Sequence, residues 1–109
     1  MTLPRAETLA AALVGRRVRT YLWREVEIAR IEDGLVVVVG GRGEERARVA
    51  LADVQAGLDQ LDLVGEVPVT ITALGPWASY VSAMLVEAEG VVYGDAPARL
   101  MLGGRAGAG

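Results

Sequence analysis

Residues 25–39 read EVEIARIEDGLVVVV and predict a β-hairpin. At the start of this stretch apolar residues alternate with glutamates, as they do in a strand with one buried face. Ile31 falls out of this alternation, which predicts a β-bulge near Ala29–Arg30. The dipeptide Asp33-Gly34 is the strongest hairpin-turn signal in the sequence. The run Leu35–Val39 is apolar throughout, so we expect a central strand that is buried on both faces.

Strand patterns continue on both sides of this hairpin. Apolar and polar residues alternate over residues 18–22, and they alternate again over 47–51, after a glycine-rich turn at 40–43. Together these runs predict a four-stranded antiparallel meander over residues 16–51, which is either open or curled into a small barrel. A helix over residues 4–14, with leucine and alanine at helical spacing, precedes the meander.

The second half of the chain changes to helical spacing. Residues 53–63 predict a helix with Asp53 as its N-cap, and residues 76–89 predict the most regular helix of the chain. Between them, residues 67–71 predict a short strand. Apolar residues of both halves are expected to form one continuous core. They are Val26, Ile28, Val36, Val38, Leu58, Leu61, Val81 and Leu85.

We expect one α+β domain over residues 1–102, followed by a disordered glycine-rich tail over 103–109. Two architectures fit the order of the elements, which closes with a hairpin over residues 91–102. One is a single antiparallel sheet with the helices packed on one face. The other joins the β meander of residues 16–51 to an α/β half, residues 52–102, which is winged-helix-like and would read DNA with its last helix.

Five residue types are missing from the 109 residues: Cys, His, Lys, Asn and Phe. Without Cys and His the chain has no thiolate nucleophile, no zinc site of the usual kind and no proton-transfer group suited to neutral pH. Without Lys it cannot form a Schiff base. A biased coding composition is the simplest explanation, but the chemical consequence is the same. We therefore expect a protein that is not an enzyme and that uses no metal and no cofactor.

The net charge of −3 has the wrong sign for a general polyanion binder. All of the positive charge is arginine, which favours planar, bidentate contacts with anions. No apolar run reaches the length of a membrane span, and the N-terminus lacks a signal-peptide pattern. We therefore expect a cytoplasmic protein that makes no membrane contact.

The first and fourth strands of the predicted meander carry arginines close to aromatic residues, a composition typical of platforms for single-stranded nucleic acid. If these two strands are neighbours, they form one candidate anion or nucleic-acid face. Its residues are Arg17, Arg19, Tyr21, Trp23, Arg46 and Arg48. The alternative is an ordinary solvated face, on which the arginines pair with the glutamates of the same meander.

A second candidate surface lies at the start of the helix predicted over residues 76–89. Pro76 and Trp77 open this helix, and side chains in a first turn are often only half covered. Tyr80 follows one turn later and also fits the core. Because Trp and Tyr are enriched in interface hot spots, these three residues are the candidate protein interface, with a homodimer as one possible assembly.

The same helix is a poor reader of DNA. It carries two glutamates and no arginine, and only Ser79 and Ser82 could donate hydrogen bonds to bases. The sequence therefore predicts a non-catalytic interaction or adaptor module that binds protein and that can self-associate. The alternative is a nucleic-acid-binding domain that uses the winged-helix-like half or the arginine-bearing face. An enzymatic role would need residues from a partner chain.

Overall fold

The first half of the chain folds into an antiparallel sheet. In a computed structural model, which describes residues 3–95 and 97–103, helix α1 precedes four strands in the order β1-β2-β3-β4. These elements are α1 (Ala6–Leu13), β1 (Arg17–Arg19), β2 (Glu25–Glu32), β3 (Leu35–Val39) and β4 (Glu45–Ala50). The predicted meander is confirmed. The sheet does not close into a barrel, so β1 and β4 are its two edges.

The hairpin of β2 and β3 has the features that the sequence predicts. Asp33 and Gly34 have φ angles of 49° and 75°, as a tight hairpin turn with two left-handed residues requires. The register between the two strands shifts between Ile28 and Arg30, which is the predicted bulge. Four of the five residues of β3 are buried, so β3 is covered on both faces.

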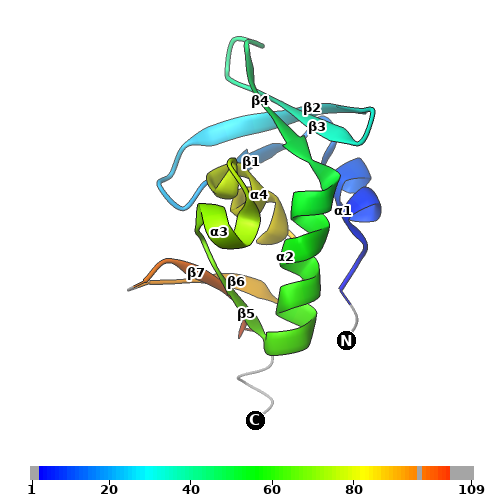
Figure 1. Ribbon diagram of the computed structural model, residues 1–109. Helices are drawn as coiled ribbons and strands as arrows, with labels where there is room; N and C mark the ends of the chain where they lie inside the picture. Colours follow the sequence, from blue (N-terminus) through cyan, green and yellow to red (C-terminus); the bar gives the residue numbers. More distant parts are fainter. Residues whose placement is uncertain (1–2, 96, 104–109) are drawn as a thin grey trace.

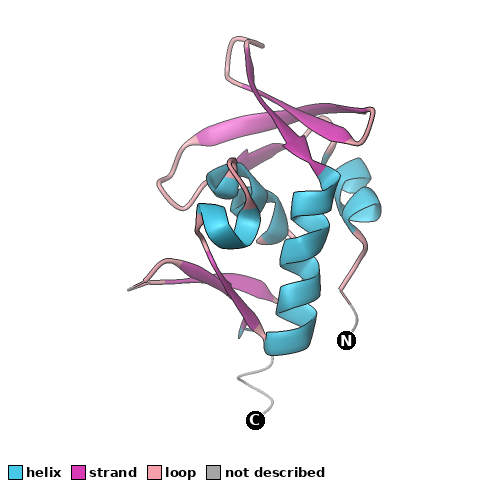
Figure 2. Cartoon of the chain, viewed as in Figure 1, coloured by secondary structure: helices cyan, strands magenta, loops and turns pink. Residues whose placement is uncertain are grey.

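The second half of the chain has its own, smaller sheet. Its elements are α2 (Leu51–Val64), β5 (Glu66–Pro68), α3 (Ile71–Leu74), α4 (Ala78–Leu85), β6 (Val91–Gly94) and β7 (Arg99–Leu102). The three strands are antiparallel and lie in the order β5-β7-β6. Figures 1 and 2 show helices α2, α3 and α4 between this sheet and the four-stranded one. The α+β class is confirmed, but the architecture with a single sheet is wrong.

One apolar core connects the two halves. All eight predicted core residues belong to a single buried cluster, to which both sheets and the helices contribute. Helix α2 lies close to the other helices because Gly57 has no side chain. A Cβ atom at this position would lie 2.6 Å from Leu85 Cδ1 and 2.9 Å from Leu74 Cδ2. The core therefore depends on volume as well as on apolar character.

Some predicted element boundaries are wrong. Helix α2 begins at Leu51, directly after β4, so Ala50 and not Asp53 is its N-cap. Ile71 begins the short helix α3 instead of ending a strand, because the Thr70 side chain caps α3 by accepting a hydrogen bond from the Ala73 N–H. Helix α4 is shorter than predicted at both ends. Within the predicted tail, only Gly103 is among the described residues.

Candidate functional site

The loop between β1 and β2 is a tight turn with three internal hydrogen bonds. The Thr20 N–H donates to the Arg24 carbonyl oxygen over 2.9 Å, and the Trp23 N–H donates to the Thr20 carbonyl oxygen over 2.9 Å. The Arg24 N–H donates to Thr20 Oγ1 over 3.2 Å. Thr20 is itself buried. The loop is therefore fixed at its base, and its three central residues project from the sheet.

Trp23 occupies the position of this loop that usually holds glycine. Its φ angle is 66°, and in a three-residue hairpin loop the last loop residue has this left-handed conformation. A bulky residue there is a conformational outlier that costs about 1–3 kcal/mol. The Trp23 side chain is 76% exposed, so burial of the ring does not offset this cost. The sequence has placed a strained aromatic residue at the tip of a loop.

A pocket of about 380 Å³ lies between this loop and the smaller sheet. Tyr21 and Trp23 line it from the loop, and Tyr93 lines it from β6. The ring centroids of Tyr21 and Tyr93 lie 6.4 Å apart, and the ring planes are inclined by 54°. The Arg19 guanidinium carbon lies 5.2 Å from the centroid of the Trp23 ring, which is a cation–π contact. We call this cavity the Tyr93 pocket.

Among the described residues, the charged groups that line the Tyr93 pocket are one arginine and two carboxylates, those of Arg19, Glu87 and Asp95. Arg19 is partly neutralised from outside the pocket, because its Nη2 lies 3.7 Å from Glu25 Oε2. Glu87 has a distant counterion in Arg16, with 4.0 Å between the charged atoms. Burial raises the pKa of Tyr93 above its ordinary value, which keeps the phenol neutral over the physiological range.

A second pocket, also of about 380 Å³, lies on the other side of the same loop. Leu22, Pro76, Trp77 and Tyr80 line it. The ring centroids of Trp77 and Tyr80 are 5.8 Å apart, and Trp77 is 40% exposed. Thr20 lines both pockets. The predicted protein interface and the aromatic part of the predicted nucleic-acid face are therefore adjacent, on one surface.

We call this region the aromatic surface. It consists of Tyr21, Leu22, Trp23, Pro76, Trp77, Tyr80 and Tyr93. Leu22 is 61% exposed and forms a prominent apolar part of it, yet the sequence did not single it out. Tyr93, Glu87 and Asp95 were missed as well. They come from a distant part of the sequence, and no local pattern signals that they meet the loop.

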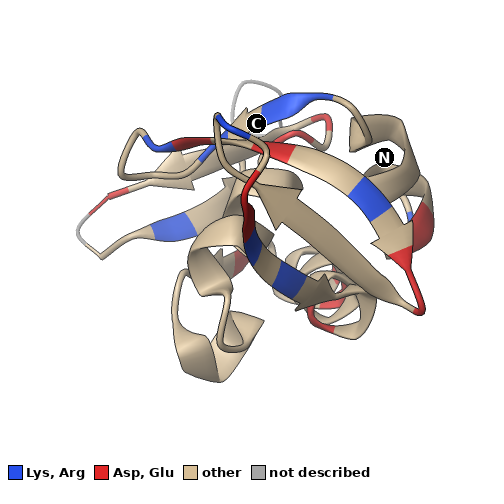
Figure 3. Ribbon diagram, turned by 90° about the horizontal axis from the view of Figure 1, so that it is seen from above, with Lys and Arg blue, Asp and Glu red and all other residues tan. Residues whose placement is uncertain are grey.

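The predicted arginine-bearing face is wrong as a single site. Strands β1 and β4 lie at opposite edges of the sheet, so Arg17 and Arg19 are separated from Arg46 and Arg48 by two strands. Each of these four arginines has a glutamate oxygen within 4.0 Å. Figure 3 shows basic and acidic segments interspersed over this part of the molecule. The paired charges agree with the alternative of a solvated face, and binding of an anion to either pair of arginines stays a prediction.

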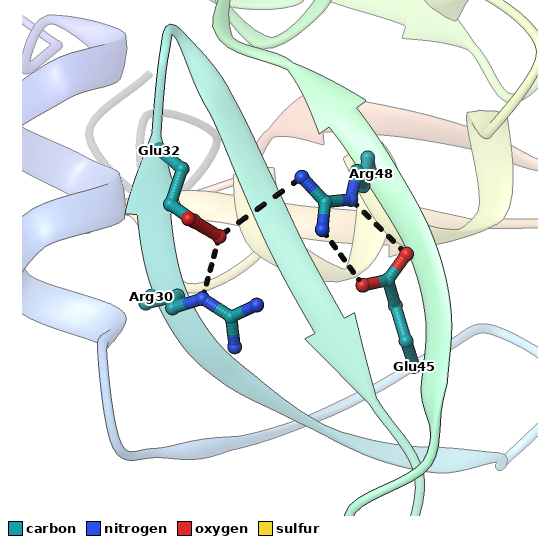
Figure 4. Close-up of polar contacts among 4 residues, drawn as sticks. All are labelled: Arg30, Glu32, Glu45 and Arg48. Carbon is teal, nitrogen blue, oxygen red and sulfur yellow. Dashed lines mark hydrogen bonds and ion pairs between the residues drawn. The ribbon is translucent and has the colours of Figure 1, made fainter.

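Part of this face covers an apolar residue. Val37 points away from the core but is fully buried, and its direct neighbours across the strands are Arg30 and Arg48. Arg30 Nε lies 2.6 Å from Glu32 Oε1, while Arg48 binds both oxygens of Glu45 over 3.0 and 3.1 Å (Figure 4). The hydrogen bonds from Arg48 lower the pKa of Glu45, and the same contact raises the pKa of Arg48.

The described residues contain no group of three or more His, Cys, Asp or Glu side chains that could hold a metal ion. Over residues 3–95 and 97–103, no helix has both the length and the apolar character needed to cross a membrane. No protein family, curated protein or solved structure matches this chain. Any functional conclusion must therefore come from the surface itself.

Proposed function

We propose that this chain is a non-catalytic binding module that recognises a protein partner through the aromatic surface. The observation that carries the proposal is the joint exposure of Leu22, Trp23 and Trp77 around two pockets that share Thr20. Large aromatic side chains beside pockets are the usual anchors of protein interfaces. A scattered exposed leucine needs no explanation, but a contiguous apolar group of this kind favours an interaction site.

The strain at Trp23 supports the same conclusion. Glycine would fit the left-handed position without cost, and exposure leaves the ring with little folding benefit. Outliers of this type cluster at active sites and at sites that hold ligands. The hydrogen bonds at the base of the loop hold the loop backbone in place before a partner arrives, so binding requires little ordering of the loop.

We also propose that the second half of the chain is winged-helix-like. Its sequence of helix, strand, two helices and two strands, with strand order β5-β7-β6, supports the likeness. A DNA-reading role for α4 is not favoured. None of its eight residues is exposed, and Ser82 is fully buried, with its hydroxyl donating to the Ser79 carbonyl oxygen. A recognition helix needs a free face.

The proposal is tested by identifying and reconstituting a partner. A photo-crosslinking residue at position 22 is used to capture contacting proteins in the native host, and each captured protein is purified and its Kd measured. Trp23→Ala and Trp77→Ala should each raise the Kd by about tenfold or more, as hot-spot truncations do. Leu63→Ala is the matched control, since Leu63 is 87% exposed and lines neither pocket.

Two results would contradict the proposal. One is a reconstituted partner whose affinity is the same for the wild-type chain, Trp23→Ala and Trp77→Ala. The other is single-stranded nucleic acid that binds at physiological salt and depends on Arg17 and Arg19, which would favour the nucleic-acid alternative. If the captured partner is a second copy of this chain, sedimentation should show a dimer that Trp77→Ala dissociates.

A further inference from the structure

The Tyr93 pocket combines aromatic rings with two carboxylates, those of Glu87 and Asp95. Tyr21, Trp23 and Tyr93 line it from two elements that are far apart in the sequence. The faces of aromatic rings carry negative potential and attract cations, most strongly when the cation is weakly hydrated. A cavity of about 380 Å³ is at the small end of the range for ligand pockets, which suits one side chain or a small organic ion.

The charges around the pocket favour a cation over an anion. Among the described residues, the charged side chains that line it are those of Glu87, Asp95 and Arg19, so negative charge is in excess. Arg19 and Glu87 each have a counterion outside the pocket, Glu25 and Arg16 respectively, whereas Asp95 adds a further negative charge. An anion entering the pocket would meet two carboxylates and an arginine that has a partner. A cation would instead be attracted by the two carboxylates, because its charge is opposite to theirs.

Arg19 shows that the Trp23 ring accepts a cation. Its guanidinium carbon lies 5.2 Å from the ring centroid, and both residues line the pocket. The chain's own cation is therefore in contact with the ring that an incoming cation would use. Such a ligand competes with Arg19, and removal of the Arg19 charge should make the site more favourable for it.

We propose that the Tyr93 pocket binds an alkylated ammonium group, such as the trimethylammonium group of a trimethyllysine side chain or of a free quaternary amine. Methylation spreads the charge over an apolar surface and weakens hydration, which suits an aromatic cavity with carboxylates at its edge. The inference rests on the proposed function for the place of binding, and it adds the chemical group that the surface recognises.

The test uses the full chain, labelled with ¹⁵N and titrated with four probes. Choline is compared with 3,3-dimethyl-1-butanol, which has the same shape and no charge. A peptide with trimethyllysine is compared with the same peptide carrying unmodified lysine. Choline and the trimethyllysine peptide should shift the Trp23 indole and Tyr93 amide resonances, with a Kd about tenfold below that of each control. Tighter binding of the peptide than of choline identifies a protein side chain as the source, and the reverse order identifies a free amine.

Three variants test the ring and the charges, and two of them, Glu87→Gln and Arg19→Gln, give the sign of the charge effect. Trp23→Ala and Glu87→Gln should weaken choline binding several-fold, and Arg19→Gln should strengthen it, because a competing positive charge is removed. Trp77→Ala is the matched control and should leave the affinity unchanged, since Trp77 lines the other pocket. Circular dichroism confirms that each variant is folded.

The inference is overturned if the neutral alcohol binds as well as choline, or if no ammonium probe shifts these resonances. It is also overturned if Arg19→Gln weakens the site while inorganic phosphate binds to the wild-type chain, which would make the pocket an anion site. A partner that still depends on Trp23 and Trp77 would leave the proposed function intact in each of these cases. If the chain binds ammonium probes but the partner's affinity does not change in Trp23→Ala or Trp77→Ala, only the proposed function is rejected.

Discussion

The hydroxyl of Tyr93 donates a hydrogen bond to the carbonyl oxygen of Arg19 over 3.4 Å. Tyr93 belongs to β6, one edge of the smaller sheet, and Arg19 ends β1, one edge of the larger sheet. The same ring lies beside Tyr21. The Tyr93 pocket is therefore built by the packing of the two halves of the chain against each other, and neither half contains it alone.

This contact predicts a loss of stability at alkaline pH. Burial raises the folded-state pKa of Tyr93 above its unfolded value of about 10. The contribution of the neutral phenol to stability is therefore complete below pH 10 and is lost as the pH rises through the raised pKa. Urea unfolding between pH 8 and 11 should show this decline, and Tyr93→Phe should reduce it. An identical pH profile for the variant would mean that the phenol titrates in solvent.

The left-handed conformation of Trp23 predicts an unusual pair of substitutions. Trp23→Gly removes the strain, so its free energy of unfolding should equal or exceed that of the wild type. Trp23→Ala keeps the strain and should be less stable than Trp23→Gly by about 1 kcal/mol. Denaturant unfolding of both variants measures the difference. A Trp23→Gly variant that is much less stable than wild type would show that the ring supports the fold.

The sequence predicts those parts of the fold that depend on local signals. The hairpin around Asp33-Gly34 follows from turn chemistry, and β3 follows from five consecutive apolar residues. The loop at Thr20–Arg24 was missed because apolar and polar residues alternate straight through it, as they would in a strand. Its turn depends on a threonine side chain and on one left-handed residue, and neither has a sequence period.

The candidate site could be predicted only in part. Trp77 could be predicted because first-turn side chains are often only half covered and Trp is enriched in interface hot spots, and Trp23 because it lies close to arginines in the sequence. The sequence could not reveal that the two tryptophans lie on one surface, because they come from distant parts of the chain. It could not settle either whether the first and fourth strands of the meander are neighbours. In the open sheet β2 and β3 lie between these strands, so the arginines of β4 and those of β1 are on different edges. Long-range packing decides such questions, and a single sequence does not record it.

The close approach at Gly57 predicts that alanine destabilises the chain there. In a free helix Gly→Ala adds about 1 kcal/mol of stability. Here the new methyl group would overlap the buried ends of Leu74 and Leu85, and overpacking of this kind costs about 1–3 kcal/mol. The net effect should be a lower melting temperature. Ala56→Gly, on the exposed side of α2, is the control for propensity alone, and a more stable Gly57→Ala would show that the helices can separate without cost.

The connection between the halves predicts that Val81→Asp unfolds the whole chain. Val81 on α4 is fully buried in the shared core, and an unpaired buried carboxylate costs several kcal/mol. Domains of this size have only about 5–15 kcal/mol of stability. Val64→Asp makes the same chemical change on an exposed valine and should remain folded by circular dichroism. A folded Val81→Asp variant with an unchanged melting temperature would remove Val81 from the core.

Arg48 separates a structural role for the arginines from an anion-binding role. Its stem lies beside Val37, and its guanidinium binds Glu45. Arg48→Met keeps an apolar stem over Val37 and should retain most of the stability at pH 7, whereas Arg48→Ala uncovers the valine and should lower the urea midpoint. Because Arg48 lowers the folded-state pKa of Glu45, their pairing stabilises the wild type above the unfolded pKa of glutamate and loses this effect as the pH falls through the lowered value. Both variants should therefore lose less stability on acidification than the wild type.

Inorganic phosphate provides the opposing test. If it stabilised the wild type but neither variant, Arg48 would be part of an anion site instead of a cover for Val37.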